Sequence, residues 1–318
     1  MKKVATIGFF DGVHRGHQYL CQQLKQLAGK LSAESSEAVS TMVLTFEEHP
    51  QRVLGRHDAP RLLCSRADKT YFLENVCYID EVVFLDFSLE MAALSARDFM
   101  EQYLRDRYGV THLLIGYDHH FGRPQHDALG NRIPEGFEDY QRYGRELGIE
   151  VVLAKELPSA EHVSSSVIRR LVKEGDIAHA NRLLGYDFRV SGRVVSGHQE
   201  GRKMGFPTVN IQPLDDVMLL PAHGVYVTSA YVRGRNYPAV TNIGHRPTLD
   251  NGPELSVESH FLGVERLPDL SGETMLLDFH QRLREEQRFD DVEALKAQIA
   301  ADVDEAIAWH REHVQNIY

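Results

Sequence analysis

The sequence predicts two domains of different class: an α/β domain over residues 1–187 and an antiparallel β domain over residues 188–318. Up to Asp187, short apolar runs alternate with longer segments of helical composition, which is typical of a parallel sheet with crossover helices. From Arg189 to Phe279, β-type runs follow one another between Gly and Pro turns with no amphipathic helix between them. This second texture indicates a barrel or a sandwich.

In the first domain, five apolar runs alternate with five helical segments. The expected strands are KVATIG, STMVLTF, EVVFLDF, THLLIG and EVVLA, and the expected helices are Gln18–Leu31, Arg66–Asn75, Ala96–Arg107, Gly136–Leu147 and Ser165–Glu174. The stretches GKLSAESSEAVS and GRPQHDALGNRIPEG are expected as surface loops. Ligands of such sheets lie beyond the carboxyl ends of the strands, where GFFDGVHRGH, TFEEHP and GYDHHFG fall.

In the second domain, the expected strands lie in RVSGRVVSG, GVYVTSAYV, YPAVTNIG, LSVESHFLG and TMLLDFHQRL. Apolar residues recur at helical spacing after Asp291, at Val292, Leu295, Ile299, Val303, Ala306 and Ile307. We therefore expect one C-terminal helix that packs on the β domain.

The composition excludes several classes of protein. A chain of 318 residues with a net charge of −11 has no basic footprint for nucleic acid, and it contains no apolar run of membrane-spanning length. Cys21, Cys64 and Cys77 have neither metal-ligand spacing nor the density of a disulfide scaffold, so buried or free thiols are expected. We expect a cytoplasmic protein, a monomer or weak homo-oligomer, whose partners are small molecules rather than nucleic acid or membrane.

The turn after the first strand has the features of a phosphate site. Glycine-rich backbone that leads into a helix presents free N–H groups and the positive end of the helix dipole. His14 and His17, three residues apart, would lie on one side of this turn and donate hydrogen bonds to phosphate. Two alternatives stay open at this point, namely that the histidines only cap and pack, or that they hold a metal without an evident third ligand.

The stretch GFFDGVHRGH resembles the G-x-F-D-G-x-H-x-G-H signature of nucleotidyltransferases in the HIGH-motif superfamily. The matching residues are Gly8, Phe10, Asp11, Gly12, His14, Gly16 and His17. A second signature of that superfamily, S-S-T-x-I-R, is matched by Ser164, Ser165, Ser166, Ile168 and Arg169, although the serines also fit ordinary helix N-caps. The resemblance implies a Rossmann-like domain in which these residues face the phosphates of ATP.

In the β domain, GRKMGFPTVNI places Thr208 and Asn210 two residues apart on an expected strand, so both side chains lie on one face. Their oxygen atoms suit a hard cation such as Mg²⁺, which takes its other ligands from substrate phosphates. An edge strand with a turn proline is the simpler alternative.

The motif G-x-x-x-G-F-P-T-x-N resembles that of riboflavin kinases, and LLPAHGVYV, VTNIGHRPTL, VESHFL and LREEQRF continue the match. Together with the first domain, the chain resembles the bacterial bifunctional riboflavin kinase/FAD synthetase family over nearly all its length. The resemblance implies that the second domain is a riboflavin kinase barrel that makes FMN. It also implies that the first domain adenylates FMN to FAD with release of pyrophosphate, and that both reactions use ATP and Mg²⁺.

The resemblance also implies roles for individual residues. Glu258 would be the base of the kinase, with Thr208 and Asn210 as ligands of Mg²⁺–ATP. His14, His17 and Arg169 would stabilise the phosphates during adenylyl transfer. Further ATP contacts would come from Gly8, Phe10, Asp11, Gly12, Gly16, Asp118, Ser164, Ser165, Gly201, Lys203, Gly205 and Pro207, and flavin contacts from Arg284 and Glu286.

The chain departs from the family pattern at His119, where an aromatic residue is usual, and in a longer loop after Gly122. These departures leave two alternatives: a monofunctional riboflavin kinase with an inactive first domain, and a flavin carrier without enzymatic activity. A carrier needs no base and no metal ligands, so Thr208, Asn210 and Glu258 argue against it.

Overall fold

The chain folds into two compact units, residues 1–60 with 66–163 and residues 61–65 with 164–318. The computed structural model describes residues 2–56, 58–116, 121–123, 125–126, 132–133, 135–196, 205–246, 254–264 and 267–313. The predicted α/β and antiparallel β architectures are both confirmed. The described residues include no helix that is both long and apolar enough to cross a bilayer.

The first unit is built on a parallel sheet with the strand order β3-β2-β1-β4-β7. The strands are β1 (Lys2–Ile7), β2 (Val39–Phe46), β3 (Glu81–Leu85), β4 (His112–Ile115) and β7 (Glu150–Leu153). β2 and β3 are added on one side of β1, and β4 and β7 on the other. Ligands of open α/β sheets bind at the point where the strand order reverses in this way. The turn after β1 therefore lies at the expected end of the sheet.

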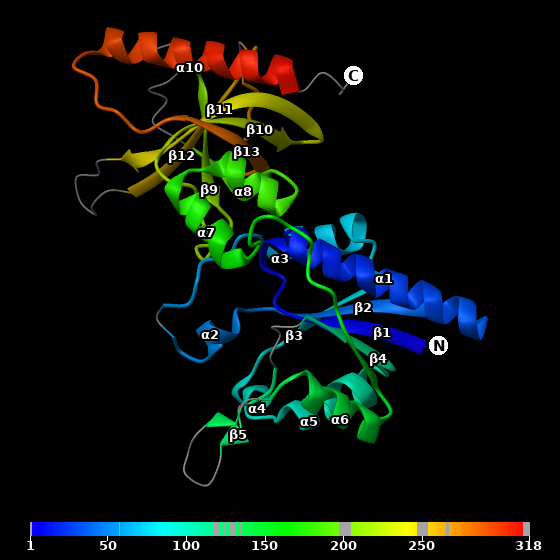
Figure 1. The fold of residues 1–318 in the computed structure, drawn as a ribbon. Helices are drawn as coiled ribbons and strands as arrows, with labels where there is room; N and C mark the ends of the chain where they lie inside the picture. Colours follow the sequence, from blue (N-terminus) through cyan, green and yellow to red (C-terminus); the bar gives the residue numbers. More distant parts are fainter. Residues whose placement is uncertain are drawn as a thin grey trace. The chain divides into compact units, whose positions relative to one another are not determined.

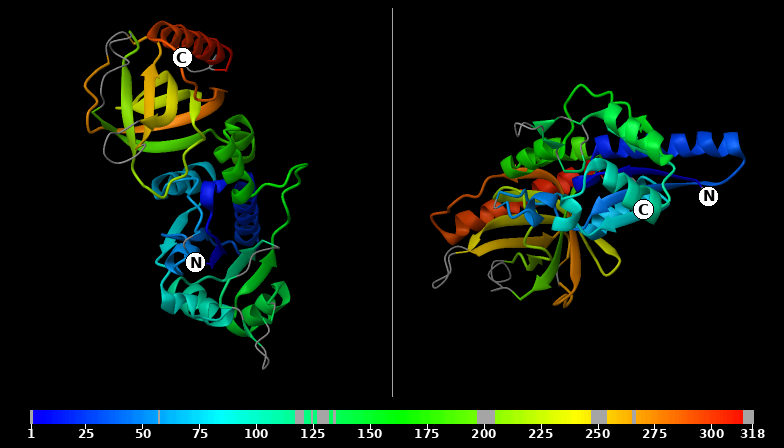
Figure 2. Two further views of the ribbon diagram at one scale, coloured as in Figure 1. Left: turned by 90° about the vertical axis from the view of Figure 1, so that its left-hand side faces the viewer. Right: turned by 90° about the horizontal axis from the view of Figure 1, so that it is seen from below.

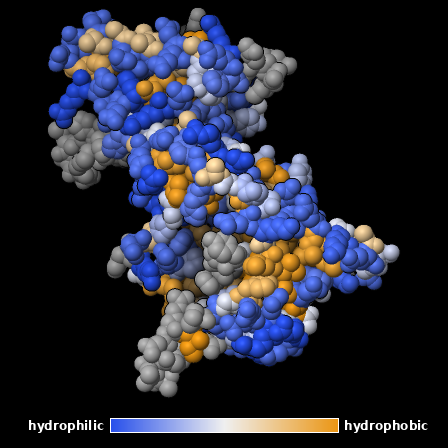
Figure 3. Space-filling model, in the orientation of Figure 1, coloured by the Kyte–Doolittle hydropathy of each residue, from blue (hydrophilic) through white to orange (hydrophobic). Residues whose placement is uncertain are grey.

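Helices cover both faces of this sheet, with α1 (Arg15–Ser35) on one face and α5 (Ala96–Phe99) and α6 (Phe137–Leu147) on the other (Figure 1). The remaining helical segments are α2 (Pro50–Val53), α3 (Arg66–Tyr71), η2 (Phe72–Val76), α4 (Leu89–Ala92) and η3 (Met100–Arg107). Met100, Leu104 and Tyr140 are buried against the sheet. Figure 3 shows further apolar residues on the visible surface of this unit between α1 and α6.

Two details of the first unit differ from the sequence expectation. The stretch GKLSAESSEAVS is not a loop from its start, because α1 continues to Ser35 and ends where Ser36 takes a left-handed conformation (φ 55°). No Pro interrupts this stretch, and Ser35 Oγ bonds back to the carbonyl of Leu31 at 2.8 Å. In the second expected loop, β5 (Gln125–His126) pairs with β6 (Arg132–Ile133).

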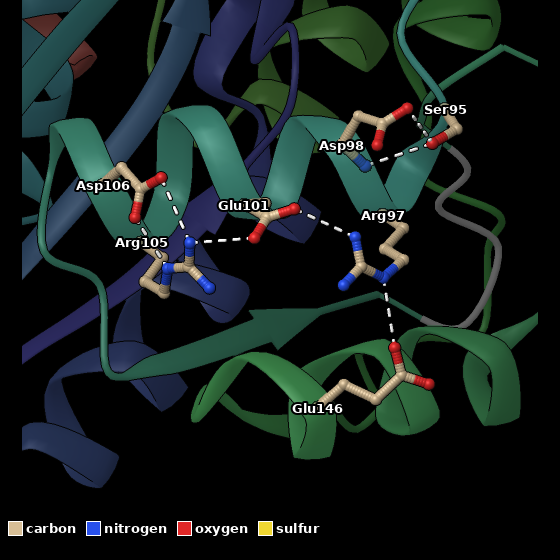
Figure 4. A network of polar contacts seen from close by, with 7 residues as sticks. All are labelled: Ser95, Arg97, Asp98, Glu101, Arg105, Asp106 and Glu146. Atoms are coloured by element: carbon tan, nitrogen blue, oxygen red, sulfur yellow. Dashed lines mark hydrogen bonds and ion pairs between the residues drawn. The ribbon is translucent and has the colours of Figure 1, made fainter.

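The predicted helices Arg66–Asn75 and Ala96–Arg107 form, but each finishes in π-helical turns, η2 and η3. On the surface, Glu101 of η3 accepts hydrogen bonds from Arg97 and Arg105, both at 2.9 Å. Arg97 of α5 also donates to Glu146 of α6 at 3.1 Å and so links α5 to α6 (Figure 4). Exposed pairs of this kind contribute little to stability.

The second unit is a closed antiparallel barrel with the strand order β10-β11-β12-β9-β8-β13, which decides for a barrel over a sandwich. Its strands are β8 (Phe188–Val195), β9 (Thr208–Pro213), β10 (Gly224–Val232), β11 (Arg235–Arg246), β12 (Glu254–Phe261) and β13 (Thr274–Arg284). Two helices precede the barrel, the predicted α7 (Ser165–Glu174) and the unpredicted α8 (Ile177–Leu184). Both helices belong to the same compact unit as the barrel. The predicted boundary at residue 187 between the two functional domains stays a prediction.

The expected C-terminal helix, α10 (Val292–His313), packs on the barrel as predicted (Figure 2). Ala306 and Val303 meet Val225, Val227 and Val240 of the barrel wall in one apolar cluster. A buried ion pair reinforces this contact: Arg284 of β13 donates from Nε and Nη2 to the carboxylate of Asp302, at 2.9 and 2.8 Å.

Loss of the Asp302 carboxylate is expected to destabilise the protein. Asp302→Asn leaves the largely buried Arg284 guanidinium without its counter-ion, and we expect the free energy of unfolding to fall by about 2–3 kcal/mol. The exposed Asp304 on the same helix supplies a matched control, Asp304→Asn, which should change stability by less than about 0.5 kcal/mol. Urea denaturation measures both, and equal effects would contradict a stabilising role of the pair.

A histidine on α10 makes stability depend on pH. Burial lowers the pKa of His310, and the positive charge that His280 can carry lowers it further, while the bond from Nε2 to the carbonyl of Thr228 opposes the shift. The rings of His280 and His313 both stack on Trp309. His280 Nδ1 also lies 3.1 Å from Asp187 Oδ2.

Because the unfolded chain binds a proton at His310 more readily than the folded one, this residue's contribution to stability is complete above about pH 6.5. It is lost as the pH falls from there toward the lower pKa of the folded state. We expect the unfolding free energy of the His310→Gln variant to change less between pH 7.5 and 5.5 than that of the parent protein. Denaturation curves at both pH values test this, and an unchanged slope would refute it.

Candidate functional site

The turn after β1 has an unusual backbone. Phe10, Gly12 and Val13 all have positive φ, at 53°, 76° and 33°. A β-branched residue such as Val13 rarely adopts this conformation, and backbone strain of this kind clusters at functional sites. The turn delivers His14 as the N-cap of α1, so the positive end of a 21-residue helix lies directly behind it.

The two predicted histidines lie together. The rings of His14 and His17 stack with centroids 3.7 Å apart and an interplanar angle of 17°, and Phe10 lies against His17 at 5.0 Å. Gly16 is needed for this arrangement, because a Cβ there would come within 3.2 Å of the His14 ring. A Cβ at Gly8 would likewise come within 3.0 Å of the Phe10 ring. These two glycines therefore make room for rings, and their approach to a ligand stays a prediction.

Residues that the sequence analysis did not single out hold this turn in place. The buried Lys69 of α3 donates from Nζ to the carbonyl of Phe9 at 2.7 Å and lies 4.0 Å from the centre of the Phe9 ring. Thr45 at the end of β2 donates to the same carbonyl at 2.9 Å. Nothing in the local sequence marks Lys69, because a lysine in an amphipathic helix is ordinarily a solvated residue.

The second nucleotidyltransferase signature forms the start of α7. Ser164 is the predicted N-cap, and its Oγ accepts a hydrogen bond from the backbone N–H of Val167 at 3.4 Å. Arg169 donates from Nε to the carbonyl of Arg61 at 2.8 Å. Ser164, Ser165 and Arg169 belong to the second compact unit, so their approach to His14 and His17 stays a prediction.

Several predicted residues lie outside the described part of the chain, namely Asp118, Gly201 and Lys203, together with the variant His119. Gly122, which precedes the longer loop, is described. It packs so closely on the backbone of Ala96 that a Cβ would come within 2.3 Å, and the following Arg123 N–H bonds to the carbonyl of Leu94 at 2.7 Å. The start of the variant loop is thus anchored to α5.

In the barrel, β9 and β12 bring together the residues predicted for phosphoryl transfer. Thr208 Oγ1 donates to Glu258 Oε2 at 3.4 Å, and Asn210 is the direct cross-strand partner of Glu258. Cross-strand partners lie on the same face of a sheet. A hydroxyl, an amide and a carboxylate therefore converge on one side of two neighbouring strands.

A cavity of about 330 Å³ lies beside Thr208 and Asn210. Pro207, Thr208 and Asn210 line one part of it, and the segments Val194–Ser196 and Leu267–Ser271 line the rest. Gly205, two residues before Pro207, is exposed and has a left-handed conformation (φ 91°). The described residues contain no group of three or more His, Cys, Asp and Glu side chains placed to hold a metal ion. The oxygen donors of Thr208 and Asn210 nevertheless fit a hard cation that is also held by phosphates.

The sequence gives no sign that Asn242, which stands in VTNIGHRPTL, belongs to this site. Asn242 pairs with Glu258 across β11 and β12 and so extends the row of polar residues to a third strand. The predicted flavin residue Glu286 lies at the same place, since a Cβ at Gly244 would meet both Glu286 Oε1 at 2.4 Å and Asn242 Nδ2 at 3.2 Å. The other predicted flavin residue, Arg284, is occupied by its ion pair with Asp302.

Comparison with known proteins identifies a family for each part of the chain. The FAD synthetase family profile matches residues 1–167, and the riboflavin kinase profile matches residues 184–310. A crystal structure described as a macrolide-efflux protein from Streptococcus pneumoniae superposes on this protein with a TM-score of 0.82. The two sequences are 29% identical, and the match covers 97% of this chain and 94% of the other. This match confirms that the two folds occur together in one chain.

Three curated relatives carry the name bifunctional riboflavin kinase/FMN adenylyltransferase. The Pseudomonas fluorescens protein is 38% identical over 94% of this chain and 90% of its own length. The Escherichia coli K12 protein is 35% identical with the same coverage, and the Bacillus subtilis protein is 32% identical over 97% of this chain and 92% of its own. Since both domains match in this order along nearly the whole chain, the protein belongs to the family of bifunctional riboflavin kinase/FMN adenylyltransferases.

Proposed function

We propose that the barrel unit phosphorylates riboflavin to FMN with ATP, and that the parallel-sheet unit transfers the AMP group of a second ATP to FMN. The observation that carries the proposal is the convergence of Glu258 with Thr208 and Asn210, which line a cavity. Binding alone would not require a carboxylate next to a pair of metal-ligand oxygens. Membership of the family supports the same two activities.

In the kinase reaction, the 5′-hydroxyl of riboflavin attacks the γ-phosphate of ATP. The Glu258 carboxylate takes the hydroxyl proton, which is the role of a general base. Thr208 and Asn210 hold Mg²⁺, which when bound neutralises charge on the transferring phosphoryl group. Gly201, Lys203, Gly205 and Pro207 stay the residues predicted to contact the nucleotide, and Glu286 and Asn242 contact the flavin. Arg284, which is paired with Asp302, stays the second residue predicted to contact the flavin.

In the adenylyltransferase reaction, a phosphate oxygen of FMN attacks the α-phosphate of ATP, and pyrophosphate leaves. The nucleophile is already an anion, so positioning and charge stabilisation dominate. His14 and His17 donate hydrogen bonds to the phosphates at the N-terminus of α1. Asp118, Ser164, Ser165 and Arg169 stay the further residues predicted to contact ATP.

The cofactor of both reactions is Mg²⁺, and the small-molecule partners are riboflavin, FMN and ATP. All three cysteines are buried and form no disulfide, which supports a reducing compartment, and we place the protein in the cytoplasm. The charge of −11 supports a protein that does not bind nucleic acid.

The test is a time course with purified protein, riboflavin, ATP and Mg²⁺, in which riboflavin, FMN and FAD are separated by chromatography. We expect FMN to rise first and FAD to follow, and excess EDTA to stop both steps. If FMN accumulates and supplied FMN yields no FAD, the chain is a monofunctional kinase. If riboflavin binds but remains unchanged, the carrier hypothesis replaces both.

A further inference from the structure

The first unit holds two cysteines in contact. Cys21 lies on α1 and Cys77 directly follows η2. Cys77 lines one cavity together with Gln18, Gln22 and Lys25, the α1 residues that flank Cys21, and each thiol is the other's hydrogen-bond partner. Cys21 is fully buried, whereas Cys77 keeps 7% of its surface exposed. The pair is far apart in the sequence, so only the packing of α1 beside η2 brings the two sulfur atoms together.

The backbone around Cys77 is well defined. Its N–H bonds to the carbonyl of Phe72 at 2.8 Å, and the N–H of Ile79 bonds to the carbonyl of Leu73 at 3.0 Å. Between them Tyr78 takes a left-handed conformation with φ of 54°. This tight turn holds the Cys77 side chain toward α1 while the Tyr78 ring remains exposed.

A cavity of about 470 Å³ opens at Cys77. Polar side chains of α1, including Gln18, Gln22 and Lys25, line one side of it, and Val76 and Tyr78 line the other. Lys25 is one helical turn after Cys21, and its ammonium group lies 4.7 Å from the centre of the Tyr78 ring. A small polar oxidant can therefore reach Cys77 beside a positive charge, but it cannot reach Cys21.

The two thiols differ in acidity in the same sense. The hydrogen bond from Cys21 and the charge of Lys25 hold the pKa of Cys77 below its usual range, against the effect of burial. The same hydrogen bond and burial raise the pKa of Cys21. Reactive cysteines are those with thiolate character and access, and the most easily oxidised ones stand next to a second thiol.

We propose that Cys77 and Cys21 form a hydroperoxide-sensitive dithiol that closes to an intramolecular disulfide. The Cys77 thiolate attacks one oxygen of the hydroperoxide, the O–O bond breaks, and the other oxygen leaves and is protonated to water or an alcohol. Cys77 is then a sulfenic acid. The sulfur of Cys21 loses its proton and attacks the sulfur of Cys77, the S–O bond breaks, and water leaves. Two thiols are oxidised by two electrons, and one hydroperoxide is reduced.

The test treats the full-length protein with a few equivalents of hydrogen peroxide, removes the excess with catalase, alkylates free thiols and maps peptides without reduction. We expect a linked peptide pair that contains Cys21 and Cys77 and has lost two hydrogens, while Cys64 is alkylated. Thiol loss at Cys77 should be at least about tenfold faster than at Cys64, because oxidation follows thiolate character and access. Dithiothreitol should restore both thiols.

Variants keep the test decisive. In Cys21→Ala, the sulfenic acid on Cys77 should persist and be trapped by dimedone. In Cys77→Ser, Cys21 should resist the same peroxide treatment, and the matched control Cys64→Ser should still give the linked pair. Oxidation of Cys64 before Cys77, a disulfide only between different protein molecules, or unchanged oxidation of Cys21 in Cys77→Ser would each overturn the proposal. These readouts are independent of both enzymatic activities.

Discussion

Replacing Glu258 by glutamine is expected to lower the rate of riboflavin phosphorylation about 10³-fold, because the amide cannot accept the proton of the attacking hydroxyl. The substitution keeps the size of the side chain and its oxygen toward Thr208, which donates to it at 3.4 Å. Substrate binding should therefore change much less than the rate. The effect should appear in kcat and leave KM for riboflavin within a small factor.

The measurement is the initial rate of FMN formation, with FAD formation from supplied FMN as the internal control. Glu293→Gln is a matched control, because the Glu293 side chain is 82% exposed on α10 and lies in neither proposed site. That variant should retain the parent rate. A Glu258→Gln protein that makes FMN at the parent rate would remove Glu258 from the proposed mechanism.

Replacing His17 by alanine is expected to lower the rate of FMN adenylation by about 10²- to 10³-fold, the usual cost of removing one donor that stabilises transition-state charge. The His17 ring is stacked on His14 between the helix N-terminus and Phe10. Its loss removes a donor and also the ring that stacks on His14. Riboflavin phosphorylation should not change, since its proposed residues lie in the barrel.

The measurement is pyrophosphate release from FMN and ATP by the His17→Ala protein, with FMN formation in the same preparation as the control. Both rates falling together would indicate a folding defect instead of a local role. An unchanged adenylation rate would support the alternative in which the histidines only pack the start of α1. Circular dichroism of the variant excludes loss of helix as the cause.

Much of the fold could be predicted because local periodicity follows burial. Continuous apolar runs such as STMVLTF identify strands covered on both faces, and the observed β2 spans Val39–Phe46. Helix α8 was missed because its eight residues follow α7 after one Gly and one Asp, too short a stretch to show a clear period. The π-helical ends η2 and η3 have no sequence signal of their own.

The candidate sites show a similar division. The alternation along a strand places Thr208 and Asn210 on one face, so the sequence was sufficient for that pair. The pairing of Asn210 with Glu258, and of Glu258 with Asn242, depends on the register of strands that are distant in the sequence. Arg284 shows the opposite case, because its ion pair with Asp302 follows only from the packing of α10 on the barrel.

The sequence by itself determined the two domain classes, the order of the five parallel strands, and the two families of motif, because each depends on residues close together in the chain. Tertiary structure alone decided that the second domain closes as a barrel, and that Lys69 and Thr45 hold the turn carrying His14. It also decided that the thiols of Cys21 and Cys77 meet. The physical reason is that long-range contacts arise from the simultaneous burial of many apolar surfaces, so that no short stretch of sequence specifies which distant residue becomes its neighbour.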